Sequence, residues 1–170
     1  MNHRPTTSSV LVAVCAAFCA TSFGAEVAEA QDQAVSPNAL VGTWRLVEHW
    51  NRESNGPLTQ MFGPNPVGYF LHDTMGHFSV QIMRTPPMQS IAVEPDSAAL
   101  ASLRELFDGY YGAFGTYSVD AGRAESVYNI VGSTRPNLIG NDAHLPFRVV
   151  GDSLIIGDDQ TWRRVWIRVR

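Results

Sequence analysis

From residue 40 onward the chain alternates short hydrophobic runs with turn residues such as Gly151-Asp152. Runs this short, rich in β-branched and aromatic residues, are typical of strands. The predicted strands are 41–50, 57–62, 67–72, 77–84, 113–120, 125–132, 145–150, 153–157 and 162–169. A long antiparallel meander removes its exposed edges best by closing on itself. The pattern therefore predicts an all-β fold, a closed up-and-down barrel of about eight or nine strands.

One segment departs from this strand pattern. Within residues 94–112 the spacing becomes helical, and Leu100, Leu103, Phe107 and Tyr110 fall on one stripe. We therefore expect one amphipathic helix, packed with this stripe over the mouth or side of the barrel.

The two ends of the barrel sequence carry matching residues. Gly42 and Trp44 open the first predicted strand, and Trp166 and Arg168 lie in the last. A guanidinium stacks well on an indole ring. We expect the last strand to close the barrel over Trp44.

The N-terminal residues read as a secretory signal peptide over residues 1–30. An apolar run at 10–20 is too short to span a bilayer, and Ala28-Glu29-Ala30 resembles a cleavage site. Residues 31–39 then form a flexible leader, and 40–170 a single domain. We expect an exported protein, periplasmic or secreted after cleavage near Ala30, with no membrane span in the mature chain; an uncleaved anchor is the alternative.

The amino-acid composition excludes several kinds of catalytic nucleophile and argues against some classes of partner. Cys15 and Cys19 both lie in the signal, and every basic residue outside histidine is arginine, which excludes thiol and lysine nucleophiles from the mature chain. The formal net charge of −4 and the lack of a basic stripe argue against nucleic-acid partners. We expect a monomer or weak dimer whose partner is a small molecule.

Six segments in this order resemble the bacterial lipocalin-like domain family: LVGTWRLV at 40–47, GPNPVGYF at 63–70, GHFSVQIMR at 76–84, FGTYSVD at 114–120, STRPNLIG at 133–140 and VWIR at 165–168. The resemblance implies a lipocalin or calycin type of barrel with a ligand cavity, in a family without a single established activity. The chain has residues 127–129 where the family tends to carry a His pair, and Leu145 where Arg is common. Both departures remove polar groups.

Aromatic side chains are the candidate ligand-binding residues. Ligand pockets favour apolar walls with a few polar tips, which tyrosines supply. The predicted set is Trp50, Tyr69, Phe78, Phe107, Tyr110, Tyr117 and Tyr128. The alternative for each of them is a place in a filled core.

A predicted hairpin contains the only closely spaced histidines in the mature sequence. Across a four-residue turn at 73–76, His72 and His77 would oppose each other, but no third ligand accompanies them, so we expect no metal site. The same register places Tyr69 and Phe78 on the inner face with Leu71, Val80 and Ile82. The opposite face, with Phe70, Ser79 and Gln81, remains the alternative lining.

Catalytic signatures are sparse, and no cofactor motif is present. Glu48 shares a predicted face with Trp44 and would be a partly buried carboxylate there, while Arg148 is expected to face solvent. The leading hypothesis is an exported barrel that binds a small hydrophobic or amphipathic molecule. The alternatives are a cofactor-free isomerase, cyclase or hydrolase acting on a hydrophobic metabolite, and a non-catalytic module with a filled barrel.

Export can be tested on protein recovered from its own host. We expect the mature chain to begin within a few residues of Gln31, because the A-x-A site precedes it, and to react with no thiol reagent. N-terminal sequencing and thiol labelling check both points. An intact Met1 in exported material would contradict the prediction.

Overall fold

The computed structural model describes residues 36, 38–52, 56–87 and 97–170. The predicted signal peptide, most of the leader and residues 94–96 of the predicted helical segment lie outside the described residues.

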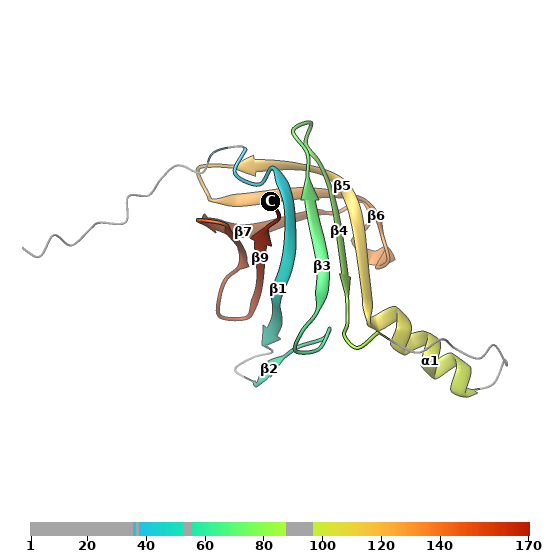
Figure 1. Ribbon diagram of the computed structural model, residues 1–170. Coiled ribbons are helices and arrows are strands. Elements are labelled where there is room, and N and C mark those ends of the chain that lie inside the picture. The colour runs from blue at the N-terminus through green and yellow to red at the C-terminus, as the bar shows by residue number, and fades with distance from the viewer. Residues whose placement is uncertain (1–35, 37, 53–55, 88–96) are drawn as a thin grey trace, which may run out of the picture. The chain divides into compact units, whose positions relative to one another are not determined.

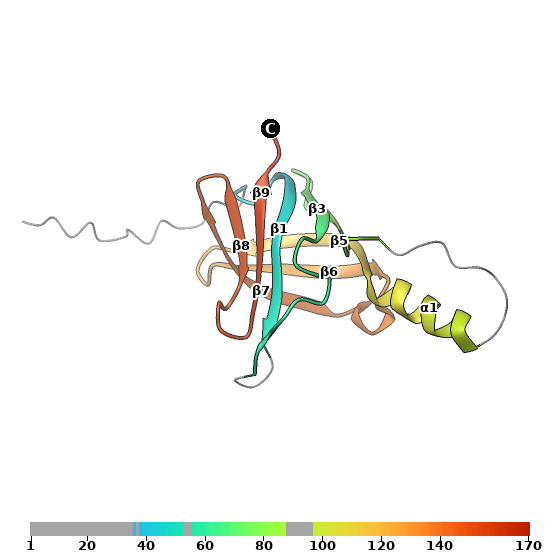
Figure 2. The same cartoon turned by 60° about the horizontal axis from the view of Figure 1, so that its bottom comes forward.

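The described residues form nine antiparallel strands, eight of which close a barrel (Figures 1 and 2). Neighbouring strands along the barrel follow chain order, and β1 pairs with β9 to complete the circle, while β2 pairs with β1 alone. The strands are β1 Gly42–Arg52, β2 Leu58–Thr59, β3 Val67–His72, β4 His77–Met83, β5 Tyr110–Asp120, β6 Glu125–Ser133, β7 Asp142–Val150, β8 Ser153–Gly157 and β9 Trp162–Arg168. The predicted closed barrel is confirmed. A short 3-10 helix, η1, spans Pro136–Leu138 between β6 and β7.

The predicted helix is also confirmed, as α1 over Ser97–Asp108, but its apolar face is uncovered. Leu100 is 70% exposed, Leu103 51% and Phe107 47%. Figure 1 shows α1 extending outward from the start of β5. The expectation that this stripe packs over the barrel is wrong, because helical periodicity identifies an apolar face without identifying what covers it.

The C-terminal half of α1 is tied to the barrel by polar contacts. Arg84 pairs with Glu105 at 2.8 Å, and Arg135 donates to the Phe107 carbonyl at 3.1 Å. Tyr110, expected on the helical stripe, instead begins β5.

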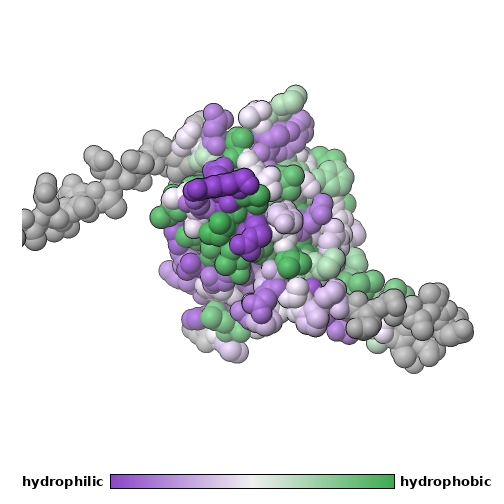
Figure 3. Space-filling model, viewed as in Figure 1, coloured by the Kyte–Doolittle hydropathy of each residue, from purple (hydrophilic) through white to green (hydrophobic). Residues whose placement is uncertain are grey.

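Within the described residues, no helix is both long and apolar enough to cross a bilayer. Figure 3 shows hydrophobic side chains scattered among hydrophilic ones on the face it presents.

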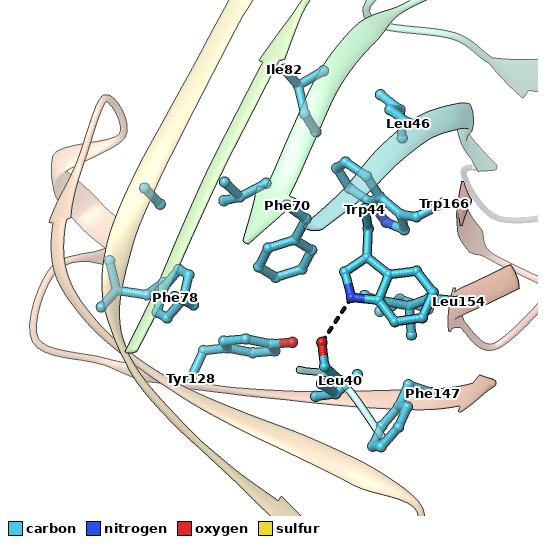
Figure 4. Close-up of a cluster of buried hydrophobic side chains, with 14 of the residues drawn as sticks. Leu40, Trp44, Leu46, Phe70, Phe78, Ile82, Tyr128, Phe147, Leu154 and Trp166 are labelled. Carbon is cyan, nitrogen blue, oxygen red and sulfur yellow. Dashed lines mark hydrogen bonds between the residues drawn. The ribbon is translucent and has the colours of Figure 1, made fainter. Parts of the chain in front are cut away.

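One end of the barrel is closed as the sequence predicts. The Arg168 guanidinium lies 4.0 Å from the centre of the Trp44 ring, and Arg168 also donates to the carbonyls of Val41 and Ala39 at 2.7 and 3.2 Å. The Trp44 indole N–H donates to the Leu40 carbonyl at 2.7 Å (Figure 4). Trp44 and Leu40 are fully buried. Residues 39–41 are therefore bound to both terminal strands.

Gly42 is required by this closure. Its φ of +130° disfavours other residues, and a Cβ there would lie 2.7 Å from the Nη1 atom of Arg168. The Gly-x-Trp pattern thus leaves room for the cation that covers the indole.

Closure can be measured by substitution. Trp44→Ala should lower the free energy of unfolding by about 3–5 kcal/mol, because it empties a fully buried site. Arg168→Ala should cost about 1–3 kcal/mol through the lost stacking and carbonyl contacts. Urea unfolding of both variants, with the exposed Arg170→Ala as control, checks the order. Equal effects for Arg168→Ala and Arg170→Ala would contradict it.

Candidate functional site

The barrel contains a cavity of about 400 Å³ that is partly open to solvent. Its wall is mainly apolar and draws on strands from around the barrel. Figure 4 shows Phe70, Phe78, Tyr128 and Trp166 directed into this interior. The apolar lining residues are Met61, Phe62, Phe70, Phe78, Val80, Ile82, Ile130, Ala143, Leu145, Ile156, Trp162 and Trp166.

The β3–β4 hairpin reaches this interior in a register that differs from the prediction. Asp73 accepts the backbone N–H groups of Met75 and His77 at 2.8 Å and donates its own backbone N–H to the His77 carbonyl at 3.0 Å, so Asp73 and His77 close the turn. His72 therefore pairs with Phe78 instead of His77. The expected opposition of the two histidines is wrong: His72 is buried inside the barrel, and His77 is exposed beside Asp73.

This register also changes the predicted inner face of the hairpin. Phe78, Val80 and Ile82 face inward as expected, but their partners on the inner side are Phe70 and His72. Tyr69 and Leu71 are exposed, at 50% and 44%. The lining therefore takes its β4 residues from the face predicted to point inward and its β3 residues from the opposite face. A shift of one residue in the pairing turns one strand over relative to the other.

A bulge in β1 changes which residues follow Leu46 into the barrel. The pairing with β9 shifts between Leu46 and Glu48, so His49 and Asn51 line the cavity. Glu48 and Trp50 lie on the outer side, where the Trp50 indole N–H donates to the Glu48 carboxylate. The prediction that Glu48 shares the Trp44 face is therefore wrong, since a bulge reverses alternation.

The predicted aromatic residues separate into three groups. Phe78 and Tyr128 lie on the cavity wall. Tyr117 is directed into the barrel but off that wall, with its ring against His72 and its hydroxyl donating to the Asp73 carbonyl at 2.9 Å. The remaining four residues do not line the cavity: Trp50, Tyr69, Phe107 and Tyr110.

Polar side chains on the wall lie toward the end opposite Trp44. His49 and Asn51 lie late in β1, and Arg164 lies early in β9, beside them. Tyr111, one residue after the predicted Tyr110, and Arg135 complete the set. Sequence reasoning missed all five. Alternation along β9 is a signal for one of them, because it places Arg164 on the same face as Trp166.

The Arg164 guanidinium is held at this end by neutral groups. It donates to the carbonyls of Trp50 and Arg163 at 2.6 and 2.9 Å, and to the Asn51 side-chain oxygen at 2.7 Å. Burial lowers the pKa of Arg164 to about 10, and it stays protonated at neutral pH. Burial raises the pKa of Tyr111, against the opposing effects of its Ser133 hydrogen bond and the charges of Arg135 and Arg164.

Two buried histidines are neutral. Burial, with the Arg164 charge as a second cause, lowers the pKa of His49 to about 3, and burial alone lowers that of His72 to about 3. The His72 Nε2 atom lies 2.9 Å from the Tyr128 hydroxyl, whose pKa burial raises. Within the described residues, neither Nδ1 atom has a hydrogen-bond partner.

Two further expectations from the sequence concern metal binding and the position of Arg148. The described part of the chain contains no group of three or more His, Cys, Asp or Glu residues arranged to hold a metal ion. Arg148 is exposed as predicted and pairs with Asp159 at 2.6 Å.

The buried histidines predict a pH dependence of stability. Their pKa values are near 3 in the folded protein and about 6.5 when unfolded, so the unfolded chain binds more protons below pH 6.5. Stability should be constant above that pH and fall by about 1.4 kcal/mol per pH unit for each histidine between about pH 6 and 4.5. Urea unfolding should show a smaller slope in His49→Gln, and an unchanged slope in the exposed His144→Gln. A slope unaffected by His49→Gln would contradict the prediction.

Comparison with known proteins agrees with this geometry. A family model described as a lipocalin-like domain matches residues 41–168, from the strand that carries Trp44 to the end of β9. A search of curated proteins finds no match. The chain belongs to the lipocalin-like domain family.

Proposed function

We propose that the protein is exported and binds a small hydrophobic or amphipathic molecule inside its barrel. The observation that carries the proposal is the cavity of about 400 Å³, which falls within the range of about 300–1,000 Å³ typical of small-molecule sites. Its apolar wall with a few polar groups has the composition such sites favour. Export rests on the sequence pattern of residues 1–30.

The cavity also favours binding over the filled-barrel alternative. Protein interiors are close-packed, and voids much larger than a water molecule are few. Closure by Trp44 and Arg168 needs no such space, since that cluster is already buried and hydrogen-bonded. Phe78 and Tyr128, from the predicted aromatic set, supply the ligand contacts in this proposal, together with Trp166.

One observation favours a small barrel enzyme as the second candidate. Tyr128 lines the cavity and lies within hydrogen-bond distance of the buried His72. In an isomerisation, the Tyr128 hydroxyl, oriented by the neutral imidazole, would give its proton to one atom of the ligand and take a proton back from another atom, so that the enzyme ends unchanged. Mass spectrometry of the molecule that co-purifies with the protein, before and after incubation with it, distinguishes conversion from binding.

Binding can be tested with the neutral apolar dye N-phenyl-1-naphthylamine. The wild type should bind it one-to-one at micromolar concentration, with displacement by hydrophobic small molecules. Ala143→Phe, which places a ring in the cavity, should weaken dye binding at least about tenfold while changing stability by no more than about 1–3 kcal/mol. Fluorescence titration measures the affinity, and thermal unfolding the stability.

Two controls accompany this test. Ala121→Phe adds the same ring at an exposed turn, and Phe107→Ala removes a ring from α1, outside the cavity; both should retain wild-type dye affinity. A wild type that binds no dye, or an Ala143→Phe variant that binds as well as wild type, would rule out the cavity as the binding site.

A further inference from the structure

The cavity wall is unbalanced in charge. Among the described residues that line it are two arginines, Arg135 and Arg164, and no aspartate or glutamate. The protein as a whole carries a net negative charge, so this local excess of positive charge does not follow from composition. It places cationic groups at one end of a chamber that is otherwise apolar.

The two arginines differ in how far their charge is already compensated. Arg135 lies 3.8 Å from the Asp108 carboxylate and 4.3 Å from the centre of the Phe107 ring. Arg164 donates to neutral oxygens and lies 5.3 Å from the centre of the Trp162 ring, and no carboxylate of the described residues forms an ion pair with it. Arg164 is partly buried, and a partly desolvated cation without a counter-ion gains free energy when an anion binds beside it.

The position of Arg164 is fixed before any ligand binds. Its contacts with Trp50, Asn51 and Arg163 hold the guanidinium against β1. An arginine side chain carries five N–H donors in a rigid plane, more than these three bonds use. A planar fork held in this way suits a carboxylate or phosphate oxygen pair, and little side-chain entropy is lost on binding.

Two neighbouring groups extend this polar end. Tyr111 lines the same cavity as the two arginines. His49, directly paired with Arg164 across β1 and β9, lines the cavity with an unpartnered Nδ1 atom within the described chain. Beyond them the wall continues as Phe70, Phe78 and Trp166.

We propose that the ligand is an amphiphile whose anionic head, a carboxylate or a phosphate monoester, binds Arg164 beside Tyr111, while its apolar tail occupies the interior against Phe70, Phe78 and Trp166. This inference rests on the binding function proposed above. It assigns the orientation of the ligand, with the head toward the end of the barrel opposite Trp44.

The test compares ligands of one chain length by displacement of the neutral dye. Decanoate and decyl phosphate carry the anion, decanol lacks it, and the two anions distinguish the two kinds of head. At neutral pH one of the anions should bind wild type about 10–100-fold more tightly than decanol, as expected for a charge-assisted hydrogen-bond pair. Arg164→Gln should remove most of that advantage, measured as the ratio of anion affinity to decanol affinity in the same variant.

The controls separate this inference from the binding function. Arg148→Gln, at an exposed position paired with Asp159, should behave as wild type. Equal wild-type affinity for decanol and both anions would overturn the anionic head while leaving the cavity as a binding site, whereas failure to bind even the neutral dye would overturn the proposed function itself. If Arg164→Gln does not fold, the wild-type comparison still decides. Loss of anion and decanol affinity to the same extent in a folded Arg164→Gln would also overturn the proposal.

Discussion

The stacking of Arg168 on Trp44 is the contact on which the rest of the barrel depends. It joins the first and last strands and, through the carbonyls of residues 39–41, fixes the segment that enters the barrel. With this end filled by fully buried side chains, the interior space lies toward the other end, between the late part of β1 and the early part of β9. This cation–π contact therefore covers the end of the barrel opposite Arg164 and Asn51.

The bulge in β1 lets one strand serve both ends. Before it, Trp44 and Leu46 face the closed end; after it, His49 and Asn51 face the cavity, opposite Arg164 and Trp162. Without the extra residue, alternation would turn Glu48 inward and remove His49. A carboxylate at that place would neutralise Arg164, so the bulge leaves Arg164 without a carboxylate partner in the described chain.

Sequence patterns predicted those features of the fold that depend on residues close together in the chain or on a single stacking contact. Alternation located the strands, and the Gly42, Trp44 and Arg168 pattern predicted the closure, because both reflect local backbone and stacking preferences. The residues of the site were harder to predict. The register at His72 depends on how Asp73 caps a turn, and the inward direction of His49 depends on a bulge. A single added residue reverses a strand face, and periodicity cannot detect it.

Two of the four buried side-chain atoms that lack a hydrogen-bond partner in the described protein belong to residues of the cavity wall. His49 Nδ1 and Trp166 Nε1 are buried on its wall without a partner in the described protein, and Arg164 beside them has donors to spare. A barrel selected only for stability would replace such groups with apolar ones, since an unpaired buried polar atom costs about 1–3 kcal/mol. Polar groups without a partner on the wall of a cavity of this size are expected at a functional site, because a bound molecule or water can supply the missing hydrogen bonds.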